Sequence, residues 1–237
     1  MNSIGAVIFD MDGVLLDTPR IHREVWLEFA PNAPWAEVRN YESTSAGRRS
    51  RDVLDELIAH RVSPGQIEDI VASLHGDFLR RCRGEDLVFP AMRRTVEQLR
   101  GNVPIALATS APRYVAVEML DDLFTSFDAT ITSDECGKGK PDPEVYARAR
   151  AALENVTSPT LAVEDTSIGV QSAVAAGCTT WALAPNPTAA SDAVRAGASV
   201  VVSDVSDLAN LIVRSARWSP RPSHGKVLGC VAKPFEG

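Results

Sequence analysis

The sequence predicts an α/β protein with a doubly wound parallel sheet and an inserted α-helical domain. Along most of the chain, short apolar runs that end in turn residues alternate with stretches of helical spacing. Short apolar runs are typical of strands buried on both faces of a parallel sheet, and their alternation with helices is typical of βαβ units. A third observation is an interval, residues 18–88, that shows helical patterns and no strand pattern.

The expected sheet belongs to a Rossmann-like core formed by residues 1–17 and 89–215. Its strands are expected at Ile4–Phe9, Val103–Ala108, Ala129–Thr132, Thr160–Val163, Thr179–Leu183 and Ser199–Val202. Its helices are expected at Ala91–Leu99, Val115–Leu123, Glu144–Leu153, Ile168–Ala176 and Val205–Val213. The tail, residues 216–237, is rich in Pro, Arg and Gly and shows no periodicity, so it is left unassigned.

The interval 18–88 is expected to fold as helices around a small core of its own. Thr18, His22 and Trp26 recur every four residues and therefore share one face of a helix. A later helix is expected to begin at Ser63-Pro-Gly-Gln66, where the serine caps the helix, the proline suits its first turn and the glutamine completes a capping box.

Composition excludes several classes of function. The chain has 237 residues with 24 basic and 31 acidic side chains, a net charge of −7. General binding to nucleic acid or to an anionic membrane requires a basic face. No apolar run approaches the roughly 18 residues of a membrane span, and residues 1–9 are too acid-flanked for a signal peptide. The four cysteines form no C-x-x-C pair, which argues against a disulfide framework or a zinc site. We expect a cytoplasmic monomer without nucleic-acid or membrane partners.

Acidic residues follow two of the expected strands, at the edge where a doubly wound sheet places its function. Asp10 and Asp12 follow the first strand, and the glycine after them lets the chain turn so that both carboxylates face one point. A solvated turn is the plain alternative, whereas an EF-hand loop is excluded because Val14 replaces an oxygen ligand. Glu164 and Asp165 follow the fourth strand, where buried charges are costly unless they are paired or bind a metal such as Mg²⁺.

Two further clusters carry groups that suit a phosphoryl oxygen. Thr109-Ser110, after the second strand, offers a hydroxyl and backbone amides, although such residues also serve as helix caps. Lys140, which precedes Pro141 at a helix start, is placed to neutralise a phosphate. A Walker loop is excluded there because the glycine spacing is wrong.

Taken in order, Asp-x-Asp-Gly, Thr-Ser, Lys-Pro and Glu-Asp resemble the four motifs of the haloacid dehalogenase superfamily of phosphohydrolases. The resemblance covers nearly the whole chain apart from the tail. The interval 18–88 resembles the C1 cap of that superfamily. Thr18, His22 and Trp26 match the spacing of its β-phosphoglucomutase-like branch, which contains both sugar-phosphate phosphatases and mutases.

The resemblance implies that Asp10 attacks phosphorus to form an aspartyl-phosphate, while Asp12 protonates the leaving oxygen and later activates water. Burial beneath a closed cap is expected to bring the pKa of Asp12 nearer to neutrality. The resemblance also implies Mg²⁺ as cofactor, held by Asp10, the backbone carbonyl of Asp12 and Asp165, with Glu164 close by or ligating through water. The phosphoryl group would be bound by Thr109, the amide of Ser110, and Lys140.

The leading functional prediction is a Mg²⁺-dependent phosphatase that acts on a small phosphorylated metabolite, such as a sugar phosphate. The first alternative is a hexose-phosphate mutase, which needs a cation in the cap to hold a second phosphate, but Ser50 stands where the mutase pattern has Arg. The second alternative is a catalytically silent sensor of a phosphorylated ligand. Candidate substrate contacts in the cap are His22, Arg48, Arg49, Arg51 and Arg80, although such arginines also occur on solvated helix faces.

Overall fold

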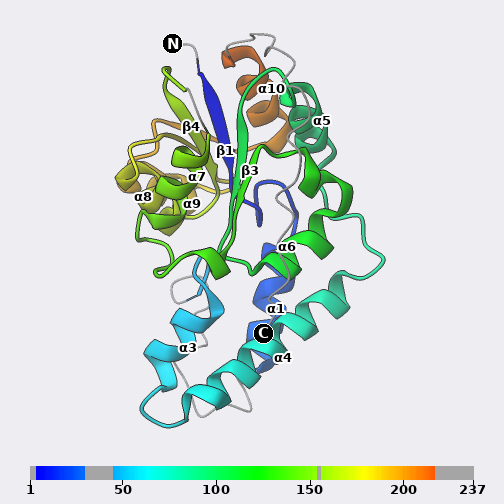
Figure 1. Cartoon of the computed structure of the whole chain (residues 1–237), viewed down its shortest axis with the longest axis vertical. Coiled ribbons are helices and arrows are strands. Elements are labelled where there is room, and N and C mark those ends of the chain that lie inside the picture. Colours follow the sequence, from blue (N-terminus) through cyan, green and yellow to red (C-terminus); the bar gives the residue numbers. More distant parts are fainter. Residues whose placement is uncertain (1–3, 30–44, 154–155, 217–237) are drawn as a thin grey trace, which may run out of the picture.

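The computed structural model describes residues 4–29, 45–153 and 156–216 and contains a parallel six-stranded sheet in the order β3-β2-β1-β4-β5-β6. The strands are β1 (Ala6–Phe9), β2 (Ile105–Ala108), β3 (Ala129–Ile131), β4 (Thr160–Glu164), β5 (Thr179–Leu183) and β6 (Val200–Val202). Helices lie on both sides of this sheet (Figure 1). The predicted α/β fold class is therefore confirmed, and each expected strand is present.

The helices follow the expected alternation with one addition. They are α1 (Pro19–Phe29), α3 (Ser50–Ile58), α4 (Pro64–Cys82), α5 (Pro90–Leu99), α6 (Arg113–Leu120), α7 (Glu144–Ala152), α8 (Ser167–Ala175), α9 (Pro187–Ala196) and α10 (Val205–Ser215), with 3₁₀ turns at Asp121–Ser126 and Ser133–Glu135. Helix α9 was not expected, because its apolar side chains are mostly alanine. Its ends nevertheless carry ordinary local markers, since Asn186 accepts from the Ala189 amide at one end and Gly197 (φ 105°) closes the other.

Alternate residues of β1 pack on opposite faces of the sheet, as the strand period of two requires. Val7 and Phe9 lie in a hydrophobic cluster with side chains of α5 and α10. Ala6 and Ile8 lie in a second cluster with side chains of α7 and α8. All four side chains are fully buried, which explains why the sequence of β1 is apolar without alternation.

The helices α1, α3 and α4 form what we call the helical insertion, and they lie together at one end of the sheet unit (Figure 1). They share a hydrophobic cluster that includes Trp26, Leu54 and Phe78. The capping box expected at the start of α4 is present, because the Ser63 hydroxyl accepts from the Gln66 amide and the Gln66 side chain accepts from the Ser63 amide. Residues 30–44 of the interval and residues 217–237 of the tail lie outside the described part of the chain.

Two short connections join the helical insertion to the sheet unit. The Asp17 amide donates to the Leu87 carbonyl at 2.8 Å, and the Phe89 amide donates to the Leu15 carbonyl at 2.9 Å. A β-bridge pairs Leu16 with Val88 between them. The chain thus leaves and re-enters the sheet unit at one place, next to the carboxyl end of β1.

The helical insertion is seated against that same edge of the sheet through α6. Val115 of α6 lies in the insertion's hydrophobic cluster. The Ser110 hydroxyl donates to the Gly47 carbonyl at 2.9 Å, and the His75 ring is hydrogen-bonded to the Tyr114 hydroxyl at 2.7 Å. These contacts close one side of the space between the two parts of the molecule.

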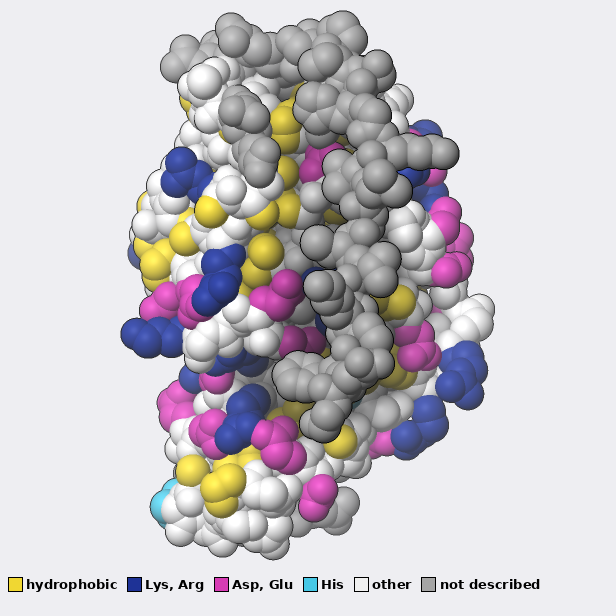
Figure 2. All heavy atoms as spheres, viewed as in Figure 1, with side chains coloured by type: hydrophobic (Ala, Val, Ile, Leu, Met, Phe, Trp, Pro, Cys, Tyr) yellow, Lys and Arg dark blue, Asp and Glu magenta, His cyan; other side chains and the backbone are white. Residues whose placement is uncertain are grey.

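The surface carries charges of both signs. On the face shown in Figure 2, dark-blue basic and magenta acidic side chains are interspersed rather than gathered into separate patches. Exposed ion pairs such as Arg93–Asp122 and Arg148–Glu144 are part of this pattern. Of the helices in the described ranges, none combines the length and apolar character needed to cross a bilayer.

Candidate active site

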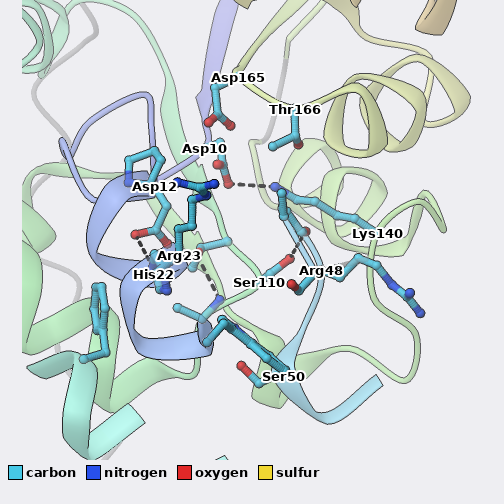
Figure 3. A pocket seen from close by; sticks show the side chains of 18 of the residues that line it. Asp10, Asp12, His22, Arg23, Arg48, Ser50, Ser110, Lys140, Asp165 and Thr166 are labelled. Carbon is cyan, nitrogen blue, oxygen red and sulfur yellow. Dashed lines mark hydrogen bonds and ion pairs between the residues drawn. The ribbon is translucent and has the colours of Figure 1, made fainter. Parts of the chain in front are cut away.

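Three neighbouring strands, β2, β1 and β4, deliver the predicted side chains to one edge of the sheet. Asp10 follows β1, Thr109 follows β2, and Glu164 ends β4 with Asp165 directly after it. Because these strands are parallel and adjacent, their carboxyl ends meet at the same edge. Figure 3 shows Asp10, Asp165 and Lys140 facing a common space.

Lys140 links two of the acids from the loop before α7. Its Nζ donates to Asp10 Oδ1 and to Glu164 Oε1, each at 2.7 Å. The side chains of Lys140, Asp10 and Glu164 are 2%, 9% and 0% exposed, so water screens their charges very little. Burial alone would lower the pKa of Lys140, but the two carboxylates outweigh burial and raise it, so the amine keeps its charge.

The acidic cluster holds more negative charge than Lys140 can balance. Carboxylate oxygens of Asp10, Glu164 and Asp165 lie within 4.8 Å of one another. Burial raises the pKa of Asp10 to about 8 against the opposing effect of Lys140. Burial, reinforced by Glu164 and Asp10, raises the pKa of Asp165 well above its usual range. A cluster whose ionisation is this costly fits a divalent cation, because the cation takes the place of the protons.

Gly13 permits the approach of Asp165 to this cluster. Its φ of +77° lies in the left-handed region that favours glycine. A Cβ at position 13 would also collide with the Asp165 carboxylate. The Asp-x-Asp-Gly sequence therefore supplies the space in which the two strand ends meet.

Glu164 has its own set of partners on both carboxylate oxygens. Its Oε1 accepts from Lys140 and, at 2.7 Å, from the Tyr146 hydroxyl. Its Oε2 accepts from the Asp165 amide at 3.1 Å and from the Thr166 hydroxyl at 3.1 Å. Glu164 thus lies within reach of a metal in the acidic cluster, and it also holds Lys140 in place.

Asp12 faces the helical insertion rather than Lys140. Its Oδ1 accepts from the Thr18 hydroxyl at 2.5 Å and lies 3.0 Å from His22 Nε2, while the His22 ring stacks on Phe78 with centroids 4.0 Å apart. Burial would raise the pKa of Asp12, but His22 and Thr18 outweigh burial and lower it. The expected shift toward neutrality is therefore wrong for the protein without substrate, because two partners stabilise the carboxylate.

Thr109 and Ser110 line the same space. The Thr109 hydroxyl accepts from the Ala111 amide at 3.0 Å, which is a capping contact, and the Thr109 side chain is almost fully buried. The Ser110 hydroxyl donates to Gly47 of the insertion, so Ser110 also takes part in the contact between the two parts of the molecule.

The space between the sheet edge and the helical insertion is a cavity of about 480 Å³. Its acidic lining residues, Asp10, Asp12 and Asp165, come from the sheet unit. The charged or titratable residues that the described part of the insertion adds to the lining are Arg20, His22, Arg23, Arg48 and His75. The cavity is therefore acidic at the strand ends and basic at the insertion.

Of the four arginines predicted to contact substrate, the structure places one, Arg48, in the lining of this cavity. Arg48 lines the cavity, but its guanidinium donates to Glu56 at 2.6 Å and points away from the carboxylates (Figure 3). Arg80 is outside this lining and pairs with Asp77 on the surface of α4.

Arg51 lines a second cavity of about 630 Å³ and pairs with Asp55 and Glu68. Arg49 borders that second cavity and binds Asp52 together with backbone carbonyls of the sheet unit. Neither of these two arginines lines the cavity that contains Asp10.

Comparison with known proteins agrees with this geometry. A model of the haloacid dehalogenase-like hydrolase family matches residues 4–177. The chain belongs to this family. The family is one of hydrolases, as the four motifs predicted. The predicted similarity to its β-phosphoglucomutase-like branch is confirmed too, because β-phosphoglucomutases are among the similar proteins.

Relatives within the family include both hydrolases and mutases. A phosphorylated carbohydrates phosphatase of Thermotoga maritima is 31% identical over 175 residues, which is 73% of this chain and 81% of that protein. The β-phosphoglucomutase of Bacillus subtilis is 27% identical over 185 residues, 73% of this chain and 80% of that protein. The crystal structure of β-phosphoglucomutase from Clostridium difficile superposes with a TM-score of 0.74 at 21% identity, covering 89% of this chain and 96% of that one.

Sequence reasoning missed three residues of this family member's site. Tyr146 is fully buried and its hydroxyl donates to Glu164. In the sequence it is a single tyrosine on the apolar face of an expected helix, which does not by itself indicate a site residue. Arg23 lines the cavity and reaches toward the carboxylates (Figure 3), although it directly follows the candidate His22. Thr166 follows the Glu-Asp pair, contacts Glu164 and caps α8.

Proposed function

We propose that the protein is a Mg²⁺-dependent phosphatase that hydrolyses a small phosphorylated metabolite through an aspartyl-phosphate at Asp10. The observation that carries this proposal is the meeting of Asp10, Lys140 and Asp165 next to the carboxyl ends of β1 and β4, with Asp12 lining the same cavity. The phosphatase among the relatives adds support for phosphorylated carbohydrates as the substrate class. The cavity volume of about 480 Å³ suits a substrate of sugar-phosphate size.

The residues present fit a magnesium ion at the acidic cluster. Asp10 and Asp165 each have a raised pKa that a cation would relieve, and both supply the hard oxygen ligands that Mg²⁺ prefers. We assign these two carboxylates and the Asp12 carbonyl to the ion, with Glu164 beside them holding Lys140. When bound, the ion neutralises the repulsion between the Asp10 carboxylate and an anionic phosphoryl group.

In this scheme Asp10 Oδ attacks phosphorus, the bond to the leaving oxygen breaks, and a water molecule later attacks the aspartyl-phosphate to release inorganic phosphate. Lys140 stays charged and stabilises the dispersed negative charge during both steps. Thr109 and the amide of Ser110 are placed on the cavity wall to bind the phosphoryl oxygens.

Asp12 serves as acid and then as base. Its lowered pKa favours the carboxylate that activates water in the second step. In the first step Asp12 must carry a proton for the leaving oxygen, and an anionic substrate beside it raises its pKa because like charges disfavour ionisation. His22 and Thr18 hold the carboxylate oxygen in place between these two states.

The helical insertion acts as the cap of this site, with residues 18–88 as its extent. One observation favours the mutase alternative, because Arg23 extends from α1 into the cavity, where it is placed to hold a second phosphate (Figure 3). Against it, Ser50 lines the cavity where the mutase pattern has Arg, and Arg48 is paired with Glu56. The cytoplasmic location and monomeric state expected from the sequence stay predictions.

A panel of phosphate monoesters, assayed for phosphate release with Mg²⁺, tests the proposal. We expect turnover by the wild type, loss of turnover in Asp10→Asn, and normal turnover in Asp69→Asn, which changes an exposed aspartate of α4. A mixture of β-glucose 1-phosphate and a bisphosphate primer tests the mutase, since a mutase would form the isomer faster than free phosphate. Thermal stabilisation by phosphate esters without any hydrolysis would instead identify a silent sensor.

A further inference from the structure

Arg49 lies at the start of α3 and reaches out of the helical insertion to the loop that carries Lys140. Its Nη1 donates to the Cys136 carbonyl at 2.8 Å, and its Nη2 donates to the Gly137 carbonyl at 3.2 Å. Its Nε and Nη2 also donate to the two oxygens of Asp52, each at 2.7 Å. The guanidinium is thus held in one orientation by its own helix while it binds the backbone of the sheet unit.

The loop passes close to this ion pair. A Cβ at position 139 would collide with the Asp52 carboxylate and with Arg49 Nε. Any side chain at position 139 would displace the Arg49–Asp52 ion pair, and the next residue in the chain is Lys140.

The opposite side of the loop is fixed by the sheet unit. Glu144 of α7 accepts from the Lys138 amide at 2.9 Å, and backbone hydrogen bonds, with Lys138 first, lower the pKa of Glu144 to about 2. The loop is therefore held between α7 on one side and Arg49 of the insertion on the other. Its last residue, Lys140, places its amine on Asp10 and Glu164.

We propose that Arg49 is a positioning residue that couples the seating of the helical insertion to the placement of Lys140. This inference rests on the proposed function of Lys140 in phosphoryl transfer. When the insertion is seated, Arg49 supplies donors to two loop carbonyls. When it moves away, those carbonyls lose these donors, while the hydrogen bond from Lys138 to Glu144 of α7 and the ion pairs of Lys140 stay.

For catalysis, this coupling links the seating of the helical insertion to the position of the Lys140 ammonium group. The seated insertion covers one side of the cavity, and the same seating fixes the amine that balances the phosphoryl charge. The effect of Arg49 is transmitted through the loop and not through substrate, because Arg49 does not line the cavity that contains Asp10. This role differs from the substrate contact that was expected for it.

The test compares Arg49→Ala, Asp52→Asn and Arg49→Lys with Arg81→Ala as the matched control. Arg81 of α4 forms its ion pairs with Glu24 and Glu28 inside the insertion. For p-nitrophenyl phosphate we expect kcat to fall about tenfold in Arg49→Ala, with KM changed by less than about threefold, because charged hydrogen bonds to the loop are lost while the cavity wall is intact. Arg49→Lys should recover part of kcat, because a lysine keeps the charge but cannot bind both carbonyls and Asp52 together.

Hydrogen–deuterium exchange of residues 136–140 provides a readout that does not depend on activity. Exchange there should be faster in Arg49→Ala and Asp52→Asn than in the wild type and Arg81→Ala, at matched thermal stability. Equal exchange in Arg49→Ala and Arg81→Ala would refute the claim that Arg49 holds the loop through the Cys136 and Gly137 carbonyls. Faster exchange in Arg49→Ala, with a kcat equal to that of Arg81→Ala, would refute the coupling between Arg49 and the catalytic role of Lys140. The proposed phosphatase function would be unaffected by that result. Absence of turnover in the wild type would refute the proposed function, and exchange would still decide whether Arg49 holds the loop.

Discussion

Magnesium binding should strengthen steeply as pH rises from 6 to 8. In the metal-free protein, burial raises the pKa of Asp10 from 3.8 to about 8, and burial also raises the pKa of Asp165 well above its usual range. Below pH 8 a cation must therefore displace at least one proton from the cluster, and apparent affinity changes about tenfold per pH unit for each proton displaced. Because the slope levels off as pH approaches the pKa of about 8, displacement of one proton predicts an apparent Kd about 50-fold lower at pH 8 than at pH 6.

The sign for stability follows from the same shift. Because the folded pKa of Asp10 lies above its unfolded value, this group stabilises the metal-free fold fully below pH 3.8, and the stabilisation is lost as pH rises toward 8. Added Mg²⁺ opposes that loss, so the rise in Tm caused by Mg²⁺ should grow across the same range.

Isothermal titration of Mg²⁺ in two buffers of different ionisation enthalpy measures both the affinity and the protons released. Asp165→Asn should abolish binding, whereas Asp69→Asn, at an exposed position, should bind as the wild type does. An apparent Kd that is the same at pH 6 and pH 8, with no proton release, would refute this reading of the cluster.

Three other changes have expected outcomes. Gly13→Ala should raise the Mg²⁺ concentration needed for half-maximal activity at least about tenfold, because its Cβ displaces Asp165. Gly84→Ala, with a similar positive φ and open space around it, is the control for backbone strain, and equal effects in both would contradict the argument. Tyr146→Phe should lower the free energy of unfolding by about 1–2 kcal/mol in urea titrations, since Glu164 loses a buried donor; an unchanged midpoint would count against it. Arg23→Ala should raise KM for esters that carry a second anionic group more than for p-nitrophenyl phosphate, and equal changes would remove Arg23 from substrate binding.

The centre of the sheet could be predicted from the sequence because β1 and β2 are fully buried and have uninterrupted apolar runs. Val7 and Phe9 pack on one side of the sheet and Ala6 and Ile8 on the other, which leaves no polar position in β1. Apolar runs could not find α9, because its apolar side chains are mostly small alanines. Its capping residue Asn186 was the better marker.

The strand-end residues of the site could be predicted because parallel topology alone brings them together. The arginines could not, because their direction depends on how α1 and α3 are seated and on which acid lies nearest. Arg48 is turned toward Glu56, and Arg49 toward the loop before Lys140, while Arg23 reaches into the cavity. The pKa of Asp12 was misjudged for a related reason, since its tertiary partner His22 outweighs burial.

The central claim is that Asp10 becomes phosphorylated during turnover. Rapid acid quenching of a reaction with a substrate of the phosphate-ester panel, followed by peptide mass spectrometry, measures this directly. We predict one phosphoryl group on the peptide that contains Asp10 and no phosphoryl group on that peptide in Asp10→Asn. Release of phosphate by the wild type without any phosphorylated peptide, or with the phosphoryl group on another residue, would contradict the account.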